Sequence, residues 1–179
     1  MPRYGEAKVT SKTQQIIAWE AQRIAQKSDV TSFAALQTTI GKLMPTEAVQ
    51  WKAIANLNYL LGQHERDWPK YVDAALAYGR QYAAQDSRTL YEAAVYLNGF
   101  VDDKLLLKKA DQIIRQAIAV DNSYFNLLIR AQLLHKLGDN SQATAVAKQA
   151  IAVANKTNEH TEEAVELLAS LAPPTSKAK

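Results

Sequence analysis

Cysteine is absent from the 179-residue chain, which rules out disulfides, cysteine nucleophiles and thiolate metal sites. Glycine and proline are scarce, with only six and five residues. No apolar run approaches the roughly 18 residues that a helix needs to span a bilayer. The first residues also lack the apolar core of a signal peptide. We therefore expect no membrane insertion, and either a cytoplasmic location or, for a processed or excised segment, a periplasmic one.

A strong excess of one charge is also lacking. The 21 basic and 18 acidic residues are scattered along the chain and give a net charge of +3. No basic stripe with interleaved aromatic residues stands out, so we expect no nucleic-acid partner. Hydrophobic residues make up 47% of the chain, many of them alanine. This composition favours close-packed helices and predicts an all-α fold.

The motifs of the common enzyme classes are missing as well. The sequence contains no nucleophile elbow, no P-loop and no glycine-rich dinucleotide-binding pattern. His64, His135 and His160 lie far apart, and none has a second histidine at helical spacing. Asp102 and Asp103 are adjacent, so on a helix their side chains would point about 100° apart, which favours a capping role over a catalytic pair. We predict a protein that is not an enzyme and binds no cofactor or metal.

The sequence does contain a succession of helical patterns, about nine in number, separated by capping and breaking residues. The first helix is expected from Ser11 to Lys27. Thr31 or Ser32 should cap the second, and Thr46 the third. The last should present Ala164, Val165, Leu168 and Leu171 on its apolar face. The sixth helix has a predicted apolar stripe of Leu106, Ala110, Ile113, Ile114 and Ala117.

The clearest pattern is a pair of helices over Tyr124–Thr157. Its first helix has Leu127, Ala131 and Leu134 on one face, and its second has a stripe of alanines that includes Ala143 and Ala150. Between them, Gly138 can adopt the left-handed conformation that ends a helix, and Asp139 can cap the next one. Small side chains on both faces allow two antiparallel helices to approach closely.

This unit resembles a tetratricopeptide repeat, a helical hairpin of about 34 residues. The resemblance depends on Ala131, the Leu137-Gly138-Asp139 turn, Ala143 and Ala150, while leucines replace the large aromatic residues of the family. It implies a right-handed array of antiparallel hairpins over residues 1–172, followed by a flexible tail at 173–179. The alternative is an irregular helical bundle.

In that family the first helix of each pair lines a concave groove that holds peptides. The resemblance therefore implies a set of partner-binding residues: Phe125, Leu128, Gln132, His135 and Lys136, with Glu92, Val95 and Gly99 from the preceding pair. Phe125 and Leu128 replace the polar residues with which chaperone-binding members clamp a carboxylate, so an apolar or mixed segment is expected. The alternative is that Phe125 and Leu128 pack against the preceding helix.

The last two-thirds of the chain also resemble helical C-terminal extensions of some bacterial thioredoxin-fold proteins. No Cys-X-X-Cys motif is present, so this resemblance implies no redox activity. The leading hypothesis is a non-enzymatic interaction or scaffold module that binds a peptide segment or a neighbouring domain. The alternatives are a helical accessory domain of a larger enzyme and a purely structural, oligomer-forming bundle.

Overall fold

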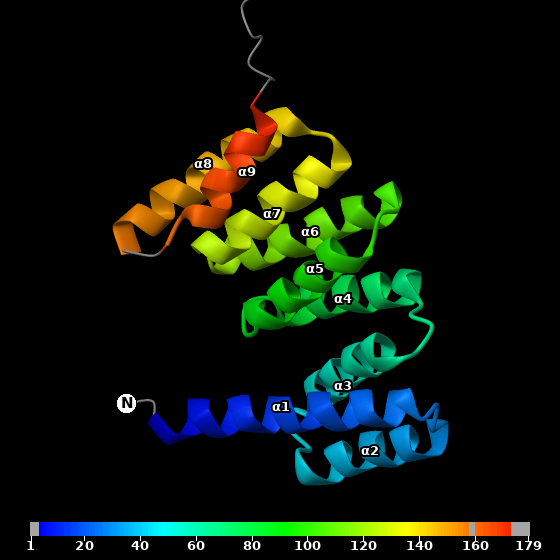
Figure 1. Cartoon of the computed structure of the whole chain (residues 1–179). Helices are drawn as coiled ribbons and strands as arrows, with labels where there is room; N and C mark the ends of the chain where they lie inside the picture. The colour runs from blue at the N-terminus through cyan, green and yellow to red at the C-terminus, as the bar shows by residue number, and fades with distance from the viewer. Residues whose placement is uncertain (1–3, 158–159, 173–179) are drawn as a thin grey trace, which may run out of the picture. The chain divides into compact units, whose positions relative to one another are not determined.

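The protein is built from helices (Figure 1). The computed structural model describes residues 4–157 and 160–172, with side chains from Lys12 onward. Over these ranges it contains nine α-helices and no β-strand: α1 (Tyr4–Gln26), α2 (Val30–Leu43), α3 (Ala48–Gly62), α4 (Trp68–Tyr82), α5 (Ser87–Phe100), α6 (Lys104–Val120), α7 (Tyr124–Leu137), α8 (Asn140–Thr157) and α9 (Glu162–Leu171). This confirms the predicted all-α class and the approximate number of helices. The predicted tail at 173–179 lies outside the described residues.

Helix ends follow the capping residues, with three differences from the sequence prediction. Helix α1 begins at Tyr4, seven residues before the predicted start at Ser11. Asp29, rather than Thr31 or Ser32, caps α2, and its carboxylate accepts a hydrogen bond from the Ser32 backbone N–H at 2.9 Å. The preceding residue, Ser28, lies between α1 and α2 and has a positive φ of 53°. The residue before α3 is Glu47 instead of Thr46, and no side chain caps that helix.

Backbone contacts divide the chain into two compact units, Met1–Tyr78 and Gly79–Lys179, with the boundary inside α4. In the first unit, α1 packs mainly along α3, and α2 contacts both. The core between them includes Ile17, Ala21, Ile24, Trp51 and Ile54, all buried.

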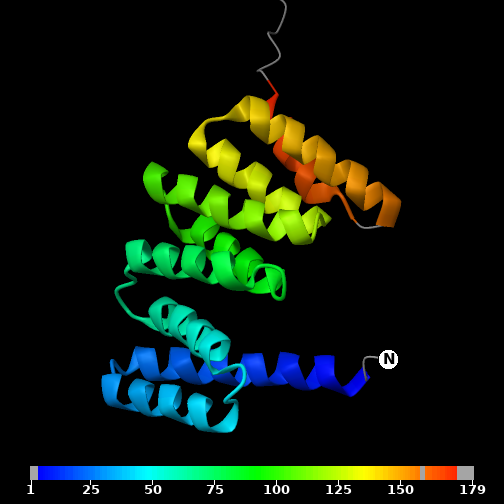
Figure 2. The same ribbon diagram turned by 180° about the vertical axis from the view of Figure 1, so that it is seen from behind.

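In the second unit, successive helices lie side by side in two hairpins, α5–α6 and α7–α8, with α9 packed against α8 and α7 (Figures 1 and 2). Helix α5 also contacts α7, so the first helices of the two hairpins meet directly. Alanine makes this packing possible: Ala131, Ala143, Ala147, Ala150 and Ala164 have no exposed surface. Together with neighbouring leucines they form one core of the second unit.

The turn between α7 and α8 confirms the prediction from the sequence. Gly138 has a left-handed φ of 85°, and the Asp139 N–H donates to the Leu134 carbonyl at 2.9 Å, which closes the end of α7. The Asp139 carboxylate then accepts from the Gln142 backbone N–H at 3.0 Å and caps α8. The handedness of the array, by contrast, stays a prediction.

Two apolar faces differ in detail from the prediction. On α6 the buried leucine is Leu107, at 1% exposure, whereas Leu106 is only partly buried. Leu107 lies three residues before Ala110, so it continues the same face towards the start of the helix. On α9, Ala164 is fully buried and Leu168 packs on the core, but Val165 is half exposed.

Candidate functional site

The second unit has a hollow of about 500 Å³ where the N-terminal ends of α5 and α7 meet. Its lining residues come from the first turns of both helices and from the connection after α6: Ser87, Arg88, Tyr91, Glu92, Asp121, Ser123, Phe125 and Asn126. Two residues of the predicted groove, Glu92 and Phe125, are therefore brought together here. We refer to this feature as the α5–α7 hollow.

One of the lining residues, Asn126, has a buried side-chain amide that holds the neighbouring backbone in place. Asn126 is only 3% exposed, and its side-chain N–H groups donate to the Asp121 carbonyl oxygen at 2.7 Å and to an oxygen of its carboxylate at 3.2 Å. These bonds fix the α6–α7 connection against the first turn of α7. Thr89, also buried, is bonded to the Asp86 carboxylate, which caps α5. Both rims of the hollow are thus anchored by short polar residues.

Aromatic rings provide the apolar wall. Phe125 is 52% exposed although it lies next to the core, and its ring meets the buried Tyr124 ring edge-on at 5.3 Å between centroids. Tyr91 lines the hollow from α5 and is partly buried. An exposed phenylalanine beside a partly buried tyrosine gives a surface that an apolar or cationic side chain can cover.

The charges around the hollow are predominantly negative. Glu92 pairs with Arg88 of the preceding turn at 2.8 Å, while Asp121 lines the other rim. Burial raises the pKa of the Tyr91 hydroxyl, and the negative charges of Glu163 on α9 and of Glu92 raise it further. Because Glu163 affects Tyr91 electrostatically, the start of α9 contributes to the field at this site.

The other predicted groove residues on α7 have structural roles. Leu128 is 3% exposed and belongs to the core of the second unit, so it does not line a groove. Gln132 accepts a hydrogen bond from the Asn98 side chain at 2.8 Å. Lys136 donates to the carbonyl oxygens of Asn98 and Val101 at 2.9 and 2.8 Å, so its charge lies at the C-terminal end of α5.

The remaining predicted residues lie away from the hollow lining. His135 is exposed and lies 3.1 Å from the Asn140 side chain across the α7–α8 turn. Val95 is partly buried on α5, one turn beyond Glu92, and Gly99 is exposed near the end of that helix. Of the predicted groove residues, Glu92 and Phe125 therefore line the hollow, whereas Gln132 and Lys136 connect α7 to the end of α5.

Several lining residues were not predicted from the sequence: Ser87, Arg88, Tyr91, Asp121, Ser123 and Asn126. Tyr91 could have been predicted as a lining residue, because it is four residues before the predicted Val95 and so lies on nearly the same helix face. The sequence pattern alone did not show that a helix start and a connection would enclose one space.

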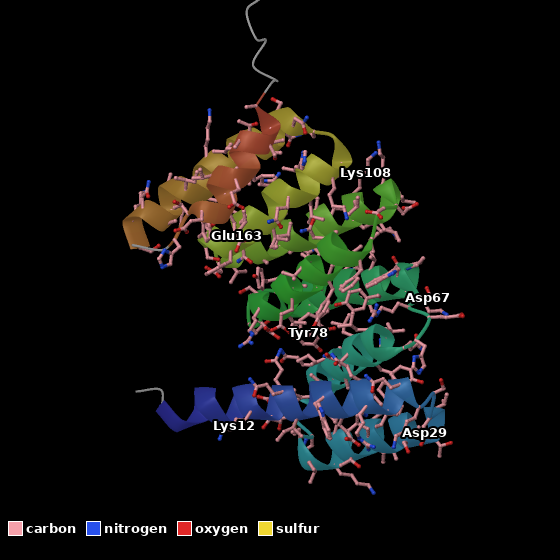
Figure 3. The ribbon with its side chains drawn as sticks, viewed as in Figure 1. Lys12, Asp29, Asp67, Tyr78, Lys108 and Glu163 are labelled. Atoms are coloured by element: carbon pink, nitrogen blue, oxygen red, sulfur yellow. The ribbon has the colours of Figure 1, made fainter. Side chains whose placement is uncertain are left out.

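Other surface features lie outside the α5–α7 hollow. A hollow of about 570 Å³ on α6 and the α7–α8 turn has four basic residues on its wall, but Asp111 already pairs with Arg115 and Arg130, both at 3.1 Å. On α1, Ile16 and Trp19 are exposed by 67% and 65%. Both residues line a shallow hollow together with Lys12, which is labelled in Figure 3.

Two further features are absent from the described residues: a metal-binding cluster and a membrane-spanning helix. Among the described residues, no group of three or more histidine, aspartate or glutamate side chains is arranged to hold a metal ion. Within the same residues, no helix has the length and apolar character that crossing a membrane requires. Comparisons with protein-family models, curated proteins and solved structures found no match.

Proposed function

We propose that the protein is a non-enzymatic interaction module and that its second unit binds a segment of another protein in the α5–α7 hollow. The observation that carries this proposal is the position of Phe125. Its side chain is half exposed at the wall of a 500 Å³ hollow, while Leu128, one turn further along α7, is buried. An aromatic side chain held in this way is a typical anchor for a protein partner.

The size and construction of the hollow also support this proposal. Several hundred cubic ångströms accommodate a few side chains of a bound segment. The walls are held in place by the Asp86 cap at the start of α5 and by the bonds of Asn126 at the start of α7. The resemblance to tetratricopeptide repeats adds the expectation of a right-handed array whose first helices face a ligand. In this proposal α5 and α7 are those helices.

The test is selection of a displayed random peptide library on the full chain. We expect bound clones that are lost when Phe125 is changed to Ser but kept when Phe100 is changed to Ser. Phe100 is the matched control because it is also exposed, by 59%, and lies at the opposite end of α5. Both changes remove an exposed ring, so neither should lower the melting temperature appreciably.

The proposal predicts that peptide binding depends on the ring of Phe125 and not on the ring of Phe100. Clones that bind both variants equally would show that the hollow is not the binding site. A large loss of stability in Phe125→Ser alone would mean that this ring mainly supports the fold. In that case the milder change Phe125→Leu, which keeps an apolar side chain, would be used to repeat the selection.

A further inference from the structure

The charges around the α5–α7 hollow indicate the chemistry of its ligand. Three carboxylates lie on or next to its rim, those of Asp86, Glu92 and Asp121. A fourth, that of Glu163 on α9, acts electrostatically on Tyr91 in the lining. One guanidinium, that of Arg88, pairs with Glu92. The formal charges therefore sum to a clear excess of negative charge at the hollow, although the chain as a whole has a net charge of +3.

The helix ends modify this field without reversing it. The N-termini of α5 and α7 each contribute a positive partial charge of about half a unit. At α5 this is offset by Asp86, whose carboxylate accepts bonds from the Thr89 N–H and hydroxyl. At α7 no side chain caps the helix, but Asp121 lies at the rim. The negative charges thus outweigh the two dipoles.

The aromatic rings favour the same kind of ligand. The face of a phenylalanine or tyrosine ring attracts a cation, most often the guanidinium of an arginine. Phe125 and Tyr91 both line the hollow, and Tyr91 already lies in the field of two carboxylates. A cationic side chain bound there would meet ring faces and carboxylates together, while its aliphatic stem would cover apolar surface.

We infer, on the basis of the proposed function, that the segment bound in the α5–α7 hollow carries an arginine or lysine next to an apolar or aromatic side chain. Glu92, Asp121 and Glu163 select the positive charge, and Phe125 with Tyr91 receives the apolar part. The basic hollow on α6 is a separate surface, and Figure 3 shows Lys108 of α6 well apart from Glu163 of α9.

The first test uses the clones whose binding to the full chain depends on Phe125. We expect these clones to be enriched in arginine or lysine beside leucine or an aromatic residue, relative to clones that bind without Phe125. A synthetic peptide of the best clone should bind about tenfold more weakly when its arginine is replaced by citrulline, the neutral isostere. If lysine is the selected residue, norleucine replaces it.

The second test changes the protein. The double variant Glu92→Gln with Glu163→Gln should bind the basic peptide about fivefold more weakly and the neutral peptide almost unchanged. The matched control is Glu47→Gln with Glu65→Gln, which removes the same charge: both residues are exposed in the first unit, and a glutamine at 47 keeps an oxygen that can accept from the Trp51 ring N–H. The control should bind both peptides as the unchanged chain does.

The outcomes separate this inference from the proposed function. Clones that depend on Phe125 but show no excess of basic residues, or that bind equally with citrulline or norleucine, would overturn the inference and leave peptide binding in place. The same holds if the control variant weakens binding as much as the test variant. The absence of any clone that depends on Phe125 would overturn both.

Discussion

At the scale of single residues, glycine marks the closest approach of two helices in the first unit. A side chain at Gly62, the last residue of α3, would place its Cβ 2.7 Å from the Cα of Gln22 and 2.9 Å from its carbonyl oxygen. Backbone atoms cannot rotate aside as a side chain does. The extensive contact of α1 with α3 therefore requires a glycine at this position.

We predict that Gly62→Ala lowers the free energy of unfolding by about 1–3 kcal/mol, because the added methyl group overpacks α1 against α3. Gly99→Ala is the control. Nothing lies within 4 Å of a Cβ at that position, so alanine should leave stability unchanged or raise it through its helix propensity. Urea denaturation of both variants measures this. Equal midpoints would contradict the close approach.

Lys136 shows how one side chain joins two hairpins. It is 30% exposed, and besides its bonds to the end of α5 it pairs with Asp102 at 2.9 Å. A positive charge there stabilises the negative end of the α5 dipole and satisfies carbonyl groups that have no partner within the helix.

We expect Lys136→Met to destabilise the chain by about 1–2 kcal/mol, since it keeps the aliphatic stem but leaves those carbonyls without the ammonium group. The same change at Lys70 is the comparison. Lys70 pairs with Asp67 on the surface, with 74% of its side chain exposed, and its loss should have little effect. If thermal melting shows that Lys136→Met and Lys70→Met lose the same amount of stability, Lys136 has no special role between α5 and α7.

At the scale of helices, the sequence predicted the ends of elements better than some of their starts. Gly138 and Asp139 act as predicted because their conformations are decided locally. The start of α2 was misplaced: Asp29 caps this helix, directly after Ser28, whose positive φ is uncommon for a residue other than glycine and was not predicted. On α6 only the first residue of the predicted apolar face was wrong: Leu107 is buried in place of Leu106, because three consecutive leucines, 105–107, leave the start of that face ambiguous.

The cap of α2 should make stability depend on pH. Hydrogen bonds from the side chain and backbone of Ser32 hold the pKa of the Asp29 carboxyl below its usual value of 3.8. A carboxyl with a lowered pKa in the folded state stabilises the fold above the unfolded pKa, and loses this contribution as the pH falls through the folded one. The affected range therefore extends downward from about pH 3.8.

The variant Asp29→Asn tests this, because asparagine can still cap a helix but does not titrate. We expect the difference in unfolding free energy between the unchanged chain and the variant to shrink as the pH decreases below that value. Denaturant titrations over a pH series measure the difference. A difference that is constant with pH would contradict the role of the ionised Asp29.

At the scale of the whole molecule, the sequence predicted the all-α class from composition and periodicity. It predicted the candidate site only in part. Phe125 and Glu92 were identified through the resemblance to tetratricopeptide repeats. Asp121 and Asn126 were not, because they join the site only when the α6–α7 connection folds back on α7. Leu128 shares the register of Phe125, yet packing decides that one is buried and the other half exposed.

The central claim is that the α5–α7 hollow binds a protein segment. Nuclear magnetic resonance mapping tests it most directly, with a library-selected peptide added to the isotopically labelled full chain. The account predicts that the largest shift changes fall on Tyr91, Phe125 and Asn126. Changes concentrated instead at Ile16 and Trp19 of α1, or on the basic hollow of α6, would contradict it.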